Sequence, residues 1–143
     1  MQTLVLGSTS IFRKMILDKL NLPFDCAKPN IDKPPSSYWA IQMESFKTLE
    51  NVSIKLSGLM TEASTGEVFH EQLFPYFKKI ISVFGTKRIM WGSDWPVLNL
   101  NGDYDAWVGL TAALLQYCSV KEQQAIWANN ARSFYNLPAQ LKN

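Results

Sequence analysis

Two hydrophobic periods alternate along the chain, one typical of strands and one of helices. Three short apolar runs of strand type each end in glycine, at residues 3–7, 51–58 and 88–92. Helical spacing of apolar residues marks the segments between and after them: residues 11–20, 36–49, a helix that includes Leu73 and ends before Gly85, 104–117 and 120–134. The pattern therefore predicts an alternation of strands and helices.

This alternation predicts the fold class. The predicted strands have no neighbour joined by a tight turn, so hairpins are not expected. Strands separated by helices are typical of βαβ units, and we expect an α/β fold with a parallel sheet covered by helices. A segment with three prolines, residues 29–37, predicts a linker or long loop that separates the N-terminal part from the rest.

Composition and charge limit the classes of partner that the chain is expected to bind. The chain has 143 residues, 47% of them apolar, which is enough for one domain with a core. Its net charge of +2 gives no electrostatic case for a nucleic-acid partner or an anionic membrane surface. No apolar run could span a bilayer, and the N-terminus lacks the cationic start of a secretory signal. We expect a cytoplasmic protein with its two cysteines as free thiols.

Lys55 is the first candidate for chemistry. In the strand "NVSIKLSG", Val52, Ile54 and Leu56 share one face, and Lys55 lies on the other. A strand buried on both faces is usually apolar throughout, so a polar face suits a barrel strand that opens on an active site. The alternative is an ordinary solvated face, and the strand pattern by itself leaves both interpretations open.

Asp94 is the second candidate. In "RIMWGSDWPV" the strand ends at Gly92, and Asp94 follows just past its carboxyl end. That end of a parallel strand carries the catalytic groups of α/β barrels. An aspartate at a strand end can equally form a simple turn. The local pattern leaves the catalytic and the turn interpretation open.

Several other polar and aromatic residues receive structural interpretations. The only histidine, His70, is expected at the surface near a helix start, and one histidine cannot build a His-rich metal centre. The polar residues near the C-terminus are expected to tie it to the body of the protein: Asn129, Asn130 and Arg132. Three aromatic residues are expected in the core: Tyr38, Trp39 and Phe46.

From about residue 34 to the end, the chain resembles the C-terminal part of an amidohydrolase-related family of the sugar-lactonase type. The matching motifs are "NVSIKLSGL", "TEA", "LFPYF", "FGTKRIMWGSDWPV" and "NNARSFYNL". The resemblance implies a partial (β/α)₈ (TIM-type) barrel that hydrolyses lactones or related C–N bonds. It implies that Asp94 activates the attacking water and could help to bind a divalent metal such as zinc, and it leaves Lys55 as a substrate or oxyanion contact.

Residues 1–33 resemble the start of a different family, the Maf-type nucleotide pyrophosphatases. The matching features are a strand, a Ser-x-Ser-x-x-Arg turn, "LPF" and "ID". The resemblance implies that Ser8, Ser10 and Arg13 face a phosphate, although plain helix capping by the serines is an equal alternative. The residue after "ID", which is acidic in that family, is Lys33 here.

The two resemblances together indicate a fusion of a Maf-like segment (1–33) with an amidohydrolase-type segment (34–143). The family's early His-x-His pair is absent, so we expect this chain alone to be inactive. Its expected partners are a small-molecule substrate and either a second copy or a complementing half-barrel. The alternatives are a nucleoside triphosphate pyrophosphatase remnant and a non-catalytic chain that folds only with a partner.

Overall fold

The computed structural model of the chain describes residues 4–6, 24–26, 33–63, 66 and 68–137. The chain divides into two compact units, Met1–Asn30 and Ile31–Asn143. In the first unit, strand β1 (Leu4–Leu6) pairs in parallel with β2 (Phe24–Cys26), with Leu4 opposite Phe24. The strand predicted at residues 3–7 is thus confirmed, and β2 was not predicted. The helix predicted at 11–20 lies outside the described residues. So do Ser8, Ser10 and Arg13, the residues expected to face a phosphate.

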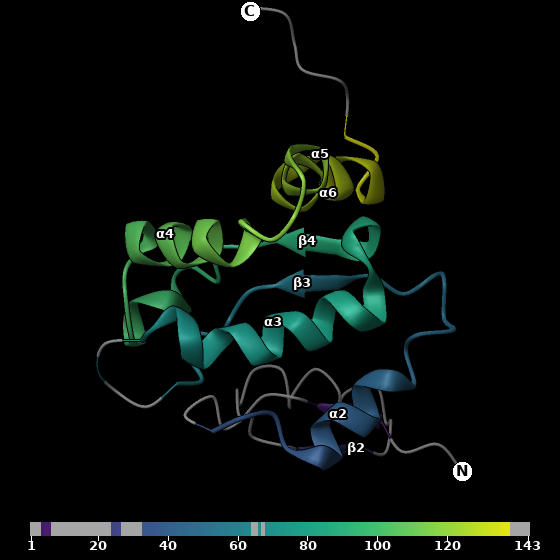
Figure 1. The fold of residues 1–143 in the computed structure, drawn as a ribbon, viewed down its shortest axis with the longest axis horizontal. Helices are drawn as coiled ribbons and strands as arrows, with labels where there is room; N and C mark the ends of the chain where they lie inside the picture. Colours follow the sequence, from purple (N-terminus) through teal and green to yellow (C-terminus); the bar gives the residue numbers. More distant parts are fainter. Residues whose placement is uncertain (1–3, 7–23, 27–32, 64–65, 67, 138–143) are drawn as a thin grey trace, which may run out of the picture. The chain divides into compact units, whose positions relative to one another are not determined.

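The second unit is built on a βαβ arrangement. Strand β3 (Ile54–Leu56) pairs in parallel with β4 (Ile89–Trp91), and helix α3 (His70–Phe84) connects them. Figure 1 shows the two strands as neighbouring arrows that point the same way, with α3 running alongside. In the described part of the chain each sheet has two strands. The predicted parallel α/β arrangement is confirmed.

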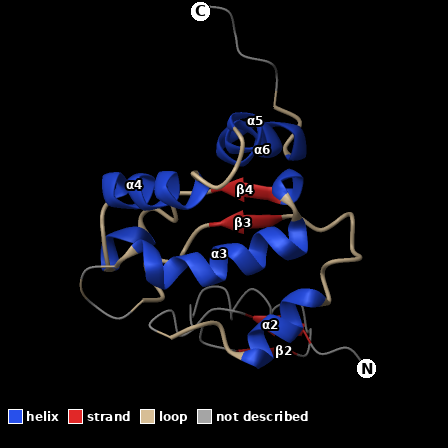
Figure 2. Ribbon diagram, in the orientation of Figure 1, coloured by secondary structure: helices blue, strands red, loops and turns tan. Residues whose placement is uncertain are grey.

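The remaining elements of the second unit follow the predicted order (Figure 2). They are α2 (Ser37–Glu44), the short 3₁₀ turns η1 (Thr86–Arg88) and η2 (Val97–Leu100), α4 (Tyr104–Leu115), α5 (Val120–Gln124), the π-helical turn η3 (Ala125–Asn129) and α6 (Asn130–Phe134). No helix in the described ranges is long and apolar enough to cross a membrane.

Polar side chains begin several of these helices. The side chains of Ser36, Asp103 and Ser119 accept backbone N–H bonds at the starts of α2, α4 and α5. Helix α3 ends at Gly85, whose φ of +60° suits a residue without a side chain. The helix end predicted there is confirmed, and His70 is the first residue of the helix as expected.

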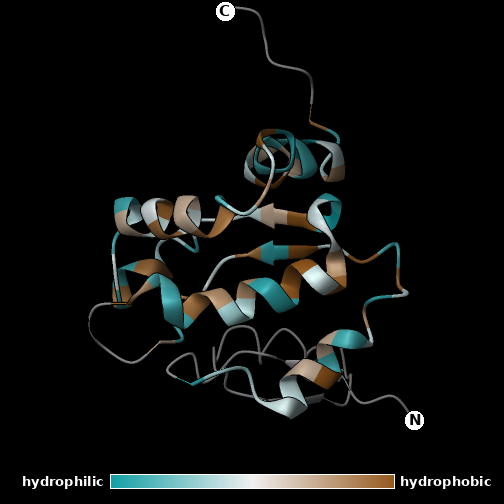
Figure 3. Cartoon of the chain, in the orientation of Figure 1, coloured by the Kyte–Doolittle hydropathy of each residue, from teal (hydrophilic) through white to brown (hydrophobic). Residues whose placement is uncertain are grey.

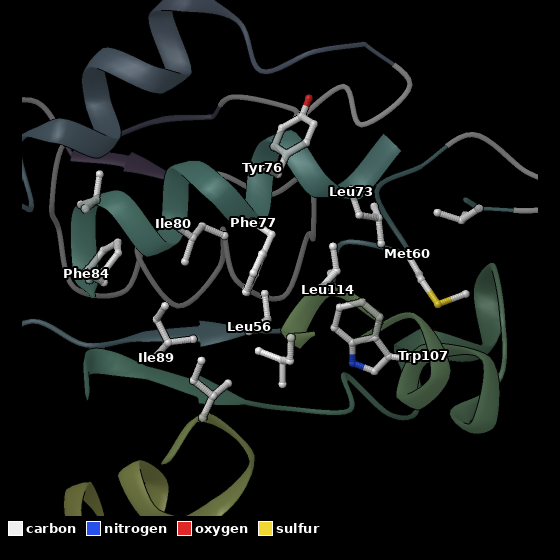
Figure 4. Packing of buried hydrophobic residues seen from close by; sticks show 14 of the residues in the cluster. Leu56, Met60, Leu73, Tyr76, Phe77, Ile80, Phe84, Ile89, Trp107 and Leu114 are labelled. Carbon is white, nitrogen blue, oxygen red and sulfur yellow. The ribbon is translucent and has the colours of Figure 1, made fainter. Parts of the chain in front are cut away.

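The core lies between α3, α4 and the two strands (Figure 4). Leu56 and Ile89 of the strands are buried, and Phe77 and Ile80 of α3 face them. Along α3, hydrophobic and hydrophilic residues alternate, as expected of a helix with one buried face (Figure 3). The apolar residues at helical spacing along α3, from Leu73 to Phe84, are buried or packed on the core, as expected of the helix predicted there.

The prediction of a core position is wrong for one of the three aromatic residues, Tyr38. Trp39 and Phe46 are partly buried against the core, but Tyr38 is 55% exposed. Trp39 packs edge-on against Tyr76 of α3, with ring centroids 5.1 Å apart. Because consecutive helical side chains point about 100° apart, the packing of Trp39 turns Tyr38 toward solvent.

Arg88 ties three segments together just before β4. Its Nη1 atom donates to the carbonyls of Leu49 at 2.6 Å and Val52 at 3.1 Å, ahead of β3. Its Nη2 and Nε atoms donate to the carbonyls of Val83 at 2.9 Å and Phe84 at 3.2 Å, at the end of α3. A cation that satisfies the last carbonyls of a helix also suits the negative end of its dipole. Arg88 therefore fixes the entry into both strands.

The Arg88 contacts generate a stability prediction. Arg88→Ala leaves several part-buried carbonyls without their donor, so we expect it to lower the free energy of unfolding by about 3 kcal/mol. The neighbouring, exposed Lys87 is the matched control, and Lys87→Ala should change stability by less than about 0.5 kcal/mol. Urea unfolding followed by circular dichroism measures both variants. Equal midpoints for the two variants would contradict the assigned role.

Candidate functional site

The candidate site lies where the carboxyl ends of β3 and β4 meet. The backbone N–H of Gly92 donates to the carbonyl of Leu56 at 3.1 Å and extends the pairing by one step. Beyond this bond the two strands continue into separate loops, one beginning at Ser57 and the other at Ser93. Asp94, on the second loop, is half-buried, and its Oδ2 accepts from the hydroxyl of Thr61 on the first loop at 3.2 Å.

The backbone of Asp94 adopts an unusual conformation. Its φ is +61°, in the left-handed region that residues with side chains seldom occupy. Its carbonyl accepts the N–H of Leu98 at 3.0 Å, which fixes the turn that follows. Aspartate is one of the few residue types other than glycine that occupy this region repeatedly, often in turns. Such conformations also occur at functional sites, so the backbone of Asp94 fits both the turn and the catalytic interpretation.

Gly58 lies beside the Asp94 carboxylate. Its φ is +76°, a left-handed backbone conformation that favours glycine. A Cβ atom placed on it would lie 3.4 Å from Asp94 Oδ2, in ordinary van der Waals contact, so the backbone conformation is what requires glycine here.

The tryptophans around Asp94 differ in exposure. Trp91 is half-buried, packs on Trp127 at 5.1 Å between ring centroids and donates from Nε1 to the Thr111 hydroxyl at 3.1 Å. Trp95 is 68% exposed. A third tryptophan, Trp107 of α4, donates from Nε1 to the carbonyl of Gly92 at 2.9 Å. Trp91 and Trp107 thus hold the strand end that carries Asp94, and Trp95 offers an aromatic surface beside it.

Lys55 has a different neighbour from Asp94. It is exposed on β3, opposite Met90 of β4, and its ammonium lies 5.7 Å from the centroid of the Tyr135 ring. This distance suits a cation–π contact with the C-terminal segment. The structure therefore pairs Asp94 with Thr61 and Lys55 with Tyr135.

The described residues do not fit a zinc site by themselves. Among them, no group of three or more His, Cys, Asp or Glu side chains lies close enough together to hold a metal ion. Zinc in hydrolases is held by three protein ligands and a water molecule, and Asp94 supplies one carboxylate.

Cys118 does not offer an alternative nucleophile. Burial raises the pKa of its thiol, and the negative charge of Glu122 acts in the same direction. The reactive form of cysteine is the thiolate, and a raised pKa keeps the thiol protonated at neutral pH.

Three residues of the site were not identified from the sequence: Gly58, Thr61 and Asn101. Asn101 donates from Nδ2 to the carbonyl of Met60 at 2.8 Å, and it accepts the N–H of Gly66 at 3.3 Å. Thr61 lies in the "TEA" motif, but its partner Asp94 is 33 positions away, so no local pattern links them. The tie expected of Asn130 is confirmed, because its side chain donates to the carbonyls of Thr86 and Ile89, both at 2.7 Å.

Comparison with known proteins places the chain in a family. The amidohydrolase family model matches residues 25–137. The chain belongs to the amidohydrolase family.

Three relatives show how the similarity is distributed. The L-fucono-1,5-lactonase of Burkholderia ambifaria is 35% identical over 118 residues, which are 78% of this chain and 39% of that protein. A crystal structure of a zinc-bound amidohydrolase from Burkholderia multivorans is 31% identical, with a TM-score of 0.67 over 70% of this chain and 37% of that one. A 7-methyl-GTP pyrophosphatase of Colwellia psychrerythraea is 76% identical over 33 residues, or 23% of this chain and 16% of that protein.

These comparisons bear on the two resemblances. The amidohydrolase likeness is shown, and so is a likeness to the pyrophosphatases over a short stretch. The chain spans about two fifths of the length of the lactonase that it matches. Its parallel strands and helices match part of an amidohydrolase structure.

The geometry at Gly58 generates a prediction. Gly58→Ala forces a side chain into the left-handed region, and we expect it to lower the free energy of unfolding by about 1–2 kcal/mol. Gly109 in α4 is the matched control, because a Cβ there meets no atom within 4 Å. Gly109→Ala should stabilise the protein by about 0.5–1 kcal/mol, since alanine favours a helix. Thermal melts of the two variants should therefore shift in opposite directions, and a destabilised G109A or an unchanged G58A would contradict this account.

Proposed function

We propose that this chain supplies the C-terminal part of a (β/α)₈ barrel that hydrolyses lactones, with Asp94 as general base. The observation that carries the proposal is the half-buried Asp94 carboxylate, held in a left-handed backbone conformation at the end of a parallel strand. The 35% identity to an L-fucono-1,5-lactonase supports a sugar lactone as the substrate class.

The proposed reaction follows from the chemistry of a carboxylate beside a lactone. Asp94 takes a proton from a water molecule while the water oxygen attacks the lactone carbonyl carbon. The C–O bond of the ring then breaks, and Asp94 returns its proton to the leaving ring oxygen, so that lactone and water become one hydroxy acid and the carboxylate is regenerated. Lys55 could stabilise the negative oxygen of the intermediate, if its ammonium moves from the Tyr135 ring toward the substrate.

The proposed barrel needs strands beyond those that the chain supplies. A closed eight-stranded barrel takes about 250 residues, whereas this chain has 143 and matches 39% of the lactonase. We propose that a complementing half-barrel, or a second copy of the chain, supplies the remaining strands. A divalent metal, suggested by the zinc-bound relative, would then take most of its ligands from that half.

The test combines the chain with the part of the Burkholderia ambifaria lactonase that it does not match. Co-expression of the two parts should give L-fucono-1,5-lactone opening above the spontaneous rate, measured as acid release with a pH indicator. Asp94→Asn should remove about a hundredfold of this activity, the usual scale for the loss of a general base. The matched control is Asp105→Asn, an exposed aspartate in the first turn of α4, which should leave the rate within about twofold.

Two outcomes would overturn the proposal. A folded complex in which D94N opens the lactone at the wild-type rate would remove Asp94 as the base. A folded complex that opens no lactone at all would remove the lactonase assignment.

A second candidate function rests on the 76% identity to a 7-methyl-GTP pyrophosphatase over 33 residues. The N-terminal Ser8, Ser10 and Arg13 would bind phosphate, but that family's acidic groups for metal and water are not matched. We therefore predict weak binding of 7-methyl-GTP that is lost in Arg13→Ala, with no release of pyrophosphate. Isothermal titration and a pyrophosphate assay with magnesium test both parts. Rapid pyrophosphate release would make this the main function and would replace the lactonase proposal.

A further inference from the structure

The Thr61 hydroxyl joins the two loops of the site. Its Oγ1 atom lies 2.9 Å from the carbonyl oxygen of Gly58 in its own turn and 3.2 Å from Asp94 Oδ2 on the other loop, so its single proton is shared between these two acceptors. Threonine is branched at Cβ, so few rotamers are open to it. The rotamer that it adopts places the hydroxyl within reach of both acceptors.

Asn101 binds the backbone of the turn that carries Thr61. Its amide nitrogen lies 2.8 Å from the carbonyl of Met60 and 3.4 Å from that of Ala63, the positions on either side of residues 61 and 62. Asn101 belongs to the loop that carries Asp94, at the end of η2. The loop of Asp94 and Asn101 thus binds the loop of Thr61 at two points. Asn101 binds the backbone on either side of Thr61, and the Asp94 carboxylate accepts from the Thr61 hydroxyl.

The contacts between the loops restrict the side chain of Asp94. Asp94 is held in a left-handed conformation that costs free energy, and a carboxylate that turns freely about χ1 would lose its direction. A hydroxyl that is itself fixed can hold one carboxylate oxygen without ordering a long side chain. Catalytic groups need such support, because a displacement of about 1 Å can cost a hundredfold in rate.

We propose that Thr61 is a positioning residue that fixes the χ1 rotamer of Asp94, and that Asn101 keeps Thr61 in place. The reason for fixing Asp94 rests on the proposed function, but the contacts themselves do not. Thr61 acts through Asp94 and makes no contact with the reacting atoms.

The test measures the side chain of Asp94 directly. The chain is labelled in aspartate and kept in its folded assembly, and the three-bond couplings that report χ1 of Asp94 are recorded by NMR. Thr61→Val keeps the branched shape but removes the hydroxyl, and it should bring the couplings to values averaged over rotamers. Thr61→Ser keeps the hydroxyl, and its couplings should match those of the wild type.

The outcomes separate this proposal from the lactonase proposal. If a folded T61V variant keeps wild-type couplings, Thr61 does not position Asp94. If T61V does not fold, Asn101→Asp decides instead, because it replaces the donor nitrogen with oxygen; averaged Asp94 couplings support the proposal and unchanged ones overturn it.

The kinetic readout uses the co-expressed pair of half-barrels. T61V should lower kcat about ten- to a hundredfold with KM within about twofold, and T61S should restore kcat. An unchanged kcat in T61V would show that the positioning of Asp94 by Thr61 does not contribute to catalysis, and would overturn the catalytic part of the proposal. If the wild-type pair opens no lactone while the couplings behave as expected, the function fails and the positioning stands.

Discussion

The parallel pairing of β3 with β4 is the constraint on which the rest of the second unit depends. The strands pair over three residues each, with Ile54 opposite Ile89 and Leu56 opposite Trp91. A one-step slip of β3 against β4 would turn the buried Leu56 to the face opposite that of Ile89 and would shift Thr61 relative to Asp94. The register therefore sets the core and the site together.

So short a sheet needs help from side chains, and four of them donate to backbone carbonyls around it. Arg88 and Asn130 bind carbonyls around the starts of the strands, and Trp107 and Asn101 bind carbonyls beyond their ends. These bonds satisfy carbonyls in the turns, the helix end and the strand ends that flank the sheet. Gly58 and Asp94, both with positive φ, lie close together at the strand ends.

Periodicity predicted the elements of the second unit well, because each depends on residues close in sequence. The strand ends at Gly58 and Gly92 and the helix end at Gly85 had local glycine signals. Asp94 could be singled out because a strand end is itself a local feature. Thr61 and Asn101 could not, because their roles depend on how two loops more than thirty positions apart meet. Tyr38 was misplaced because composition does not show which way a short helix turns.

We propose that the second unit is an open piece of a barrel whose site is completed by further strands. In the described residues β3 and β4 pair with each other alone, which leaves edges that another chain could extend. Light scattering after size exclusion, combined with a thermal melt, tests this most directly. We predict that the isolated chain forms larger species and that the complementing half-barrel converts it to a defined complex. A monodisperse 16.3 kDa species with one cooperative transition, unaffected by that half, would contradict it.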